Sequence, residues 1–193
     1  MRAWSATCAL LGAGAAGTWL AGPAAAAALV WEARGWMQAP WTLWTSAWVH
    51  FSFWHLAGNL LALAAIAVAG NALRAGRAAS VALLLAWPAG TGLLSLWPAV
   101  TGYWGLSGPI HAAVGILWAW TGLQGIARPI SFIIFGGMGL KLATERGWLR
   151  PIAFDPSWGF NIVYASHLSG ALAGAAIGIV CTLLAGRRPA VTV

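Results

Sequence analysis

The side chains in this sequence that could do chemistry are a serine and several histidines, which stand in or beside long apolar runs. Ser107 follows a glycine and a leucine, and His167 lies in the last apolar run. A serine hydroxyl is a poor nucleophile until a base takes its proton, so a serine within hydrogen-bond reach of a histidine forms an activated pair. Polar groups are costly in membrane helices and therefore suggest function. We take Ser107 and His167 as the candidate nucleophile and general base of an acyl-transfer site.

An acyl-transfer site also needs hydrogen-bond donors for the oxyanion that develops during the reaction. His55 and Asn59 are four residues apart and share one face of a helix, so they can supply two side-chain donors. The backbone N–H of Ser107 can supply another, because it stands at a helix N-terminus, where amides are unpaired. His50 is expected to point elsewhere or to precede the helix.

The spacing of small and polar residues predicts how the nucleophile and the base meet. Ser107, His111 and Gly115 repeat every four residues and form one stripe on a helix. The last apolar run carries a stripe of small residues, Gly170, Gly174 and Gly178, with His167 one turn beyond it. Small residues let a neighbouring backbone approach closely, so packing the two stripes together would bring Ser107 within reach of His167. His111 would then stack on His167, bind a substrate carbonyl or serve packing alone.

Other chemistries lack the side chains that they need. A zinc protease would want His-Glu-x-x-His on one helix face, and no acid lies between His50 and His55. An aspartyl protease needs paired acids in its helices, whereas the acids of this chain fall in or beside loops: Glu32, Glu145 and Asp155. Lys141 and Glu145, four apart, predict a structural ion pair.

These observations favour a serine–histidine dyad with no metal and no organic cofactor. Asp155 stays open as a third member of the site, although a loop acid before a helix is more often a capping or surface residue. Each polar residue taken alone is better explained as a hydrogen bond across a helix interface. The combination of residues is what indicates a site.

The composition indicates a lipid bilayer as the solvent. Of the 193 residues, 61% are hydrophobic and 7% are charged, against about 25% charged residues in ordinary globular chains. A span needs about 20 apolar residues, so the length allows about six helices in one membrane domain over residues 1–193. The formal charge of +7 comes from scattered Lys and Arg, which we interpret as topology signals rather than as a nucleic-acid surface. The two cysteines fall in expected spans and predict neither a disulfide nor a metal site.

The fold prediction is an all-α membrane protein with six transmembrane helices. The helices are expected over residues 4–31, 50–70, 79–98, 107–125, 129–144 and 160–185. A secretory signal is the alternative for the first run, but the apolar stretch is longer than a signal needs. The segment 98–106 contains proline and glycine and carries no charge, so it either dips into the membrane or forms a short external hairpin loop.

Charge in alternate loops predicts the orientation. With the N-terminus inside, the cytoplasmic side holds six basic residues and no acid: Arg2, Arg74, Arg77, Arg128, Arg187 and Arg188. The opposite side holds three arginines and all the acids. Cytoplasmic loops carry an excess of Lys and Arg, so both termini are expected in the cytoplasm and the candidate site is expected to open toward the periplasm of a bacterial inner membrane.

Three motifs in order resemble those of rhomboid intramembrane serine proteases, a six-helix family. The first motif runs from His50-Phe51-Ser52 through His55 to Asn59, the second is Gly105-Leu106-Ser107-Gly108, and the third runs from His167 through Gly170 to Gly174. The resemblance implies that Ser107 is the nucleophile and His167 the base. It also implies that His55 and Asn59 are oxyanion donors, with His50, Gly105 and Gly108 in supporting roles.

Further details resemble the rhombosortase subgroup, whose members process proteins that bear a C-terminal sorting helix with a Gly-Gly signal. These details are His111 four residues after the serine, the Lys141-Leu142-x-x-Glu145 string and the short chain. Thr42 stands where the family commonly has arginine after Trp41, and Pro109 follows the serine motif, so both depart from the pattern.

The resemblance thus implies a serine endopeptidase that cleaves membrane-anchored substrates near the periplasmic face of the lipid bilayer, with no nucleic-acid partner. The alternatives are a general rhomboid protease and an inactive rhomboid-like protein that binds membrane helices. A small transporter would use the same polar residues to line a conduction path, but no inverted repeat supports it.

Overall fold

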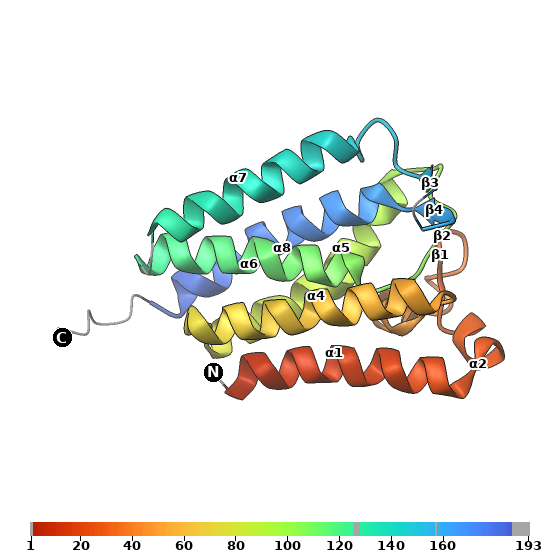
Figure 1. Cartoon of the computed structure of the whole chain (residues 1–193), viewed down its shortest axis with the longest axis horizontal. Coiled ribbons are helices and arrows are strands. Elements are labelled where there is room, and N and C mark those ends of the chain that lie inside the picture. Colours follow the sequence, from red (N-terminus) through yellow and green to blue (C-terminus); the bar gives the residue numbers. More distant parts are fainter. Residues whose placement is uncertain (1, 126–127, 157, 187–193) are drawn as a thin grey trace.

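The computed structural model describes residues 2–125, 128–156 and 158–186, and this part of the chain is mainly helical (Figure 1). Its α-helices are α1 (Arg2–Ala21), α2 (Pro23–Ala27), α3 (Thr42–Thr45), α4 (Phe53–Ala72), α5 (Arg77–Gly92), α6 (Ser107–Gln124), α7 (Arg128–Glu145) and α8 (Tyr164–Leu184). Two 3-10 helices, η1 (Ser46–Trp48) and η2 (Leu93–Leu96), follow α3 and α5. The all-α prediction is therefore confirmed for most of the described chain.

Among the described residues, four short strands form two antiparallel pairs at one end of the bundle (Figure 1). In one pair, β1 (Trp31–Glu32) lies beside β2 (Gly102–Tyr103), with Trp31 opposite Tyr103. In the other, β3 (Ala153–Asp155) lies beside β4 (Phe160–Ile162). The segment 98–106 is thus a loop that pairs with the loop after α2. Its depth relative to the membrane stays a prediction.

The long helices run side by side, and α6 lies at the centre of the bundle (Figure 1). Most residues of α6 from Gly108 to Thr121 are buried. Its closest neighbour is α8, where a Cβ atom added at Gly174 would collide with the carbonyl oxygen of Ala112, and one added at Gly170 with that of Gly108. The glycine stripe of α8 therefore packs directly on the backbone of α6, as the spacing predicted.

Several helix boundaries differ from the predicted ones. The first helix ends at Ala21 rather than at residue 31, because Gly22 has a positive φ of 87° and Pro23 begins a new helix. The last helix begins at Tyr164 rather than at residue 160, because residues 160–162 belong to β4. The helix predicted over 79–98 is α5, which runs from Arg77 to Gly92 and continues as the 3-10 helix η2. The helix predicted over 50–70 is α4, which begins at Phe53. The helices predicted over 107–125 and 129–144 agree within one residue.

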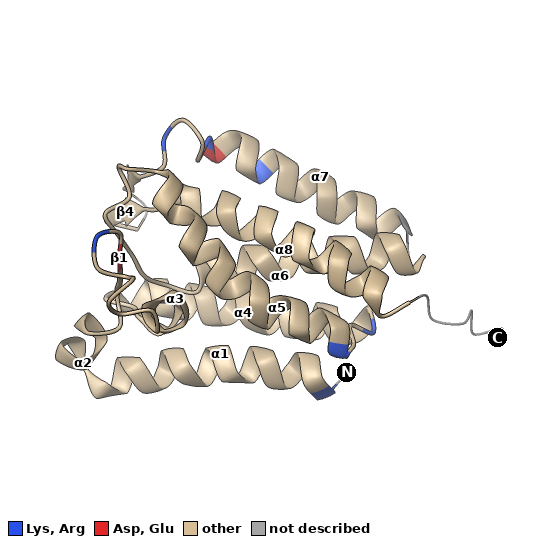
Figure 2. Ribbon diagram, turned by 180° about the vertical axis from the view of Figure 1, so that it is seen from behind, with Lys and Arg blue, Asp and Glu red and all other residues tan. Residues whose placement is uncertain are grey.

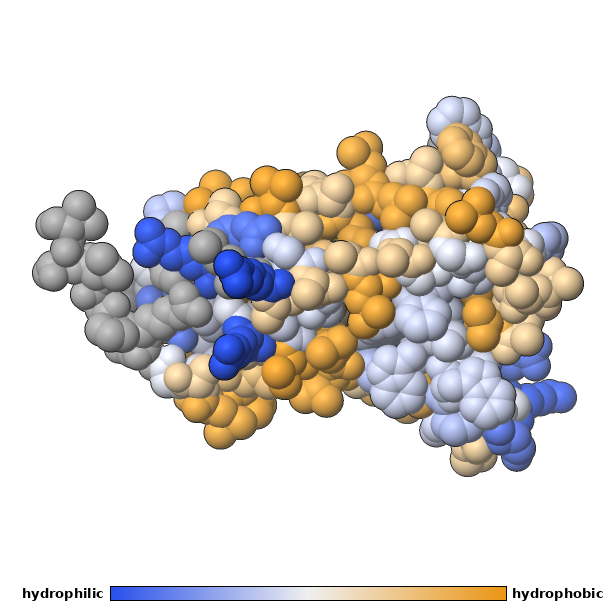
Figure 3. All heavy atoms as spheres, turned by 90° about the horizontal axis from the view of Figure 1, so that it is seen from below, coloured by the Kyte–Doolittle hydropathy of each residue, from blue (hydrophilic) through white to orange (hydrophobic). Residues whose placement is uncertain are grey.

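The surface between the two ends of the bundle is apolar. Figure 3 shows a face with hydrophobic residues in its middle and hydrophilic ones toward the ends. Many large apolar side chains of the long helices are exposed, for example Leu61 of α4 at 74% and Phe132 of α7 at 75%. Within the described residues, three helical segments are long and apolar enough to cross a membrane: Phe53–Ala72, Arg77–Leu96 and Tyr164–Leu184. Six membrane spans stay a prediction.

Charged residues of the described chain lie toward the two ends of the bundle (Figure 2). Arg2 and Arg77 begin α1 and α5 at the end that holds the N-terminus. The acids Glu32, Glu145 and Asp155 belong to β1, the last residue of α7 and β3, all at the opposite end. All three acids thus share one end with Arg34, Arg146 and Arg150, as the loop charges predicted, and Arg187 and Arg188 lie outside the described residues. The orientation in a membrane stays a prediction.

Candidate active site

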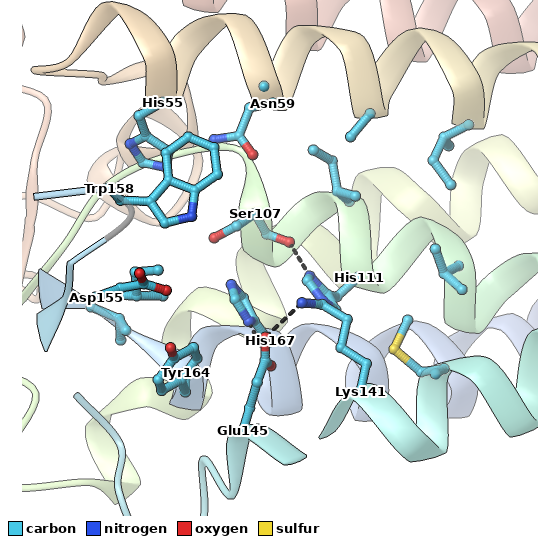
Figure 4. Close-up of a pocket in the computed structure, with 18 of the residues that line it drawn as sticks. His55, Asn59, Ser107, His111, Lys141, Glu145, Asp155, Trp158, Tyr164 and His167 are labelled. Atoms are coloured by element: carbon cyan, nitrogen blue, oxygen red, sulfur yellow. Dashed lines mark hydrogen bonds and ion pairs between the residues drawn. The ribbon is translucent and has the colours of Figure 1, made fainter. Parts of the chain in front are cut away.

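A cavity of about 790 Å³ opens at the end of the bundle that carries the strands and continues between α4 and α7 (Figure 4). Five residues of the sequence prediction line it: His55, Asn59, Ser107, His111 and His167. They come from three separate helices, α4, α6 and α8. Residues of the β3–β4 hairpin cover the mouth, where Trp158 and Phe160 pack against the His55 ring at centroid distances of 6.5 and 5.0 Å.

The loop that presents the serine is held in an unusual backbone conformation. Gly105 has a φ of +111°, which glycine adopts most readily. The hydroxyl of Tyr103, only 1% exposed, donates a hydrogen bond to the carbonyl oxygen of Gly105 at 2.7 Å. The same hydroxyl accepts one from the N–H of Gly108 at 2.9 Å. Tyr103 therefore fixes the loop around Ser107, a role that the sequence prediction missed because it treated this tyrosine as an apolar loop residue.

Ser107 is the first residue of α6 and faces the cavity (Figure 4). Its hydroxyl lies 3.5 Å from that of Ser166, which donates to the carbonyl oxygen of Val163 at 2.8 Å. In the described part of the chain no hydrogen bond joins the Ser107 hydroxyl to His167. Catalytic hydrogen bonds often tighten only when the substrate is bound. The pairing of Ser107 with His167 thus stays a prediction, supported by their place in one cavity.

The His167 imidazole is buried, with 6% exposed, and is held on two sides. Its ring stacks on that of His111, with centroids 4.1 Å apart and planes 11° apart. His111 in turn donates from Nδ1 to the carbonyl oxygen of Ser107 at 2.7 Å, one turn earlier in α6. His111 therefore links the serine backbone to the face of the candidate base.

The edge of the His167 ring contacts the carboxylate of Glu145. Its Nδ1 lies 2.8 Å from Oε2 of Glu145, whose Oε1 pairs with Nζ of Lys141 at 2.6 Å. The predicted ion pair is thus present, but the prediction missed that the second oxygen of Glu145 contacts His167. The only sequence signal was that Glu145 and His167 both fall at the outer ends of their helices. That signal predicts a similar depth in the membrane for the two residues, but it does not predict that they are in contact.

The predicted oxyanion donors lie beside the serine loop. A Cβ atom added at Gly105 would lie 3.2 Å from Nε2 of His55 and 3.8 Å from Nδ2 of Asn59. Asn59 is oriented by His50, whose Nε2 accepts from Nδ2 of Asn59 at 3.1 Å while its Nδ1 donates to the carbonyl oxygen of Trp48 at 3.3 Å. Burial lowers the pKa of His50 to about 4, so the ring is neutral near pH 7 and can accept this bond. His50 precedes α4 and supports the site from behind.

Three side chains of the cavity also have the types that bind metals. The ligand atoms of His111, Glu145 and His167 lie within 4.8 Å of one another. The ammonium group of Lys141 contacts Glu145 directly, however, and a cation there opposes a second one. The arrangement is better suited to hydrogen bonding between an acid and an imidazole.

The fold and the cavity define a helical membrane protein with a serine and histidines at one end of its bundle. The sequence matches the Rhomboid domain family over residues 37–183, so the chain belongs to the rhomboid family. That family consists generally of intramembrane serine proteases and also contains inactive members. No curated protein sequence matches this chain significantly.

Proposed function

We propose that this protein is an active intramembrane serine protease in which Ser107 is the nucleophile and His167 the general base. The observation that carries the proposal is the convergence of Ser107, His167, His55 and Asn59 on one cavity among apolar helices. Rhomboid proteins that have lost activity need not keep a nucleophile, a base and two oxyanion donors. Their joint presence favours catalysis over binding alone.

The chemistry is acyl transfer from a peptide bond. The Ser107 oxygen attacks the scissile carbonyl carbon while its proton passes to Nε2 of His167, and the carbonyl oxygen becomes an oxyanion. The side chains of His55 and Asn59, with the N–H of Ser107, donate hydrogen bonds to that oxyanion. As the C–N bond breaks, His167 returns the proton to the leaving amine. Water then attacks the acyl-enzyme with His167 again as the base, and the serine is released.

The site is proposed to face the periplasm of a bacterial inner membrane. Support comes from the basic residues at the end that holds the N-terminus and from the acids at the mouth of the cavity. Because cytoplasmic loops carry the excess of Lys and Arg, the end with Arg2 and Arg77 belongs inside and the cavity mouth outside.

The proposed substrate is a membrane-anchored protein with a C-terminal Gly-Gly sorting helix. Beyond His55 and Asn59, four of the five α4 residues that line the cavity are small, and they leave room beside the helix for a substrate segment: Gly58, Ala62, Ala65 and Ala69, with Ile66 as the larger one. A protease must bind extended backbone, and a stable helix hides its backbone amides. Glycine is about 1 kcal/mol less favourable than alanine in a helix interior, so a Gly-Gly segment exposes the bond to be cut more readily.

Co-expression with membrane-anchored reporters distinguishes the candidate functions. Two reporters differ only in the tail, one with Gly-Gly before its transmembrane helix and one with Leu-Leu, and each is tested with wild type and with Ser107→Ala. We expect Ser107-dependent release of the Gly-Gly reporter alone, measured by immunoblot. Release of both reporters would identify a general rhomboid protease, and release of neither would favour an inactive helix-binding protein.

Asn59→Ala is expected to lower kcat by about 10²- to 10³-fold, the usual effect of removing one oxyanion donor. KM should change little, because the oxyanion exists only in the transition state. The matched control is Asn71→Ala on the same helix, since Asn71 pairs with Ser5 and lies outside the cavity. Steady-state cleavage of the reporter in detergent measures both, and equal kcat for the two variants would remove Asn59 from the oxyanion site.

A further inference from the structure

The geometry points to Glu145 as a positioning residue that fixes the proton of His167 on Nδ1 and leaves Nε2 free for Ser107. This inference rests on the proposed function, because it assigns a task within the same site. The Nδ1 atom of His167 lies 2.8 Å from Oε2 of Glu145. An ionised carboxylate can only accept hydrogen bonds, so Nδ1 must be the nitrogen that carries the hydrogen.

Lys141 determines the orientation and charge of the carboxylate. Its Nζ donates to Oε1 of Glu145 at 2.6 Å, while Oε2 faces His167. The adjacent ammonium group favours the ionised form of the acid. Each oxygen of Glu145 thus has its own partner, and the carboxylate cannot rotate without breaking two charge-assisted contacts.

The backbone around Glu145 is also fixed against α8. Helix α7 ends at this residue, and Arg146 follows with a positive φ of 51°. At Gly147 an added Cβ atom would lie 2.6 Å from the carbonyl oxygen of Tyr164, which is the first residue of α8. The end of α7 therefore packs on the start of α8, one turn before His167, and this contact presents the acid to the imidazole.

The face of the imidazole is held as well as its edge. His111 stacks on it at 4.1 Å, and in Figure 4 the His167 ring lies between Ser107 and Glu145. An acid on one ring nitrogen and a serine toward the other is the arrangement by which serine hydrolases orient a catalytic histidine. A histidine so fixed keeps one orientation and one tautomer, in which Nε2 is the nitrogen that can accept the serine proton.

The decisive variant is Glu145→Gln. Lys141 can only donate, so the introduced amide must turn its oxygen to Lys141 and its NH₂ group to Nδ1 of His167. That NH₂ group donates, and the ring must then carry its hydrogen on Nε2, where it blocks proton transfer from Ser107. We expect kcat to fall by up to about 10⁴-fold with KM nearly unchanged, since about 10⁴-fold is the loss when the acid of a serine-protease triad is neutralised.

Removing Lys141 as well should restore part of the activity that Glu145→Gln loses. A purely structural role of Glu145 would not predict this recovery. In Lys141→Met/Glu145→Gln the amide is free to turn its oxygen to His167 and restore the hydrogen on Nδ1. We expect this double variant to regain at least about tenfold in kcat over Glu145→Gln, a factor worth 1.36 kcal/mol. Glu32→Gln, which neutralises an acid at the same end of the bundle but outside the cavity, is the matched control and should keep wild-type kcat.

A spectroscopic readout separates this inference from the proposed function. The chain has four histidines, so ¹⁵N-histidine labelling in detergent micelles can report the ring tautomer of His167. We expect hydrogen on Nδ1 in wild type and on Nε2 in Glu145→Gln. If the wild-type protein showed no Ser107-dependent cleavage, the proposed function would be wrong, but the tautomer of His167 could still be measured. An unchanged tautomer, or wild-type kcat in Glu145→Gln, would overturn the role of Glu145.

Discussion

Ser107→Ala and His167→Ala are each expected to lower the rate of reporter cleavage by about 10⁴-fold or more, and the double variant to be no slower than the worse single one. The reason is that the serine and its base act as a unit, so removal of either abolishes the same proton-coupled attack. Reaction of the purified protein with a fluorophosphonate measures the nucleophile directly. Wild type should be labelled at Ser107, Ser107→Ala should not react, and His167→Ala should react far more slowly.

Ser169→Ala is the matched control for the nucleophile. Ser169 is a buried serine on α8 whose hydroxyl donates to the carbonyl oxygen of Ser166 at 3.4 Å and does not line the cavity. Its loss should change labelling and cleavage by less than about threefold, as expected for a residue outside the reacting unit. Equal labelling of wild type and Ser107→Ala would show that the nucleophile is another residue, and additive losses in the double variant would show that Ser107 and His167 do not cooperate.

Gly174→Ala is expected to destabilise the fold by about 1 to 3 kcal/mol, the usual cost of overpacking a tight interface. A single methyl group at this position collides with the carbonyl group of Ala112, and backbone cannot move aside as a flexible side chain can. Separation of α8 from α6 also moves His167 away from Ser107, so activity should fall with stability. Thermal unfolding in detergent, followed by loss of the monodisperse peak in gel filtration, measures the effect.

Gly136→Ala provides the control for this substitution. Gly136 lies within α7, and beyond the adjacent backbone of that helix no atom stands within 4 Å of an added Cβ atom there. Alanine is up to about 1 kcal/mol more favourable than glycine in a helix, so this variant should be as stable as wild type or more so. If Gly174→Ala proved equally stable, the α6–α8 contact would not depend on the absence of side chains.

The helical fold could be predicted because its signals are local. Long apolar runs and the four-residue spacing of small side chains predict helices and the faces on which they pack. The break after Ala21 was missed although Gly22 and Pro23 mark it, because the apolar run continues beyond them and hydropathy alone does not register a turn. Strand β4 was missed for a similar reason, since Phe160 and Ile162 extend the apolar run of the helix that follows.

The sequence by itself determined that the protein is an apolar helical bundle of the rhomboid family, with Ser107, His167, His55 and Asn59 at one end. Motif spacing carries that information, because residues one turn apart on a helix share a face whatever surrounds them. Only the tertiary structure decided what holds those residues. Tyr103 bridges a loop, and Glu145 reaches His167 because the end of α7 packs on the start of α8. Such contacts join segments far apart in the chain, and no local pattern specifies which acid meets which imidazole.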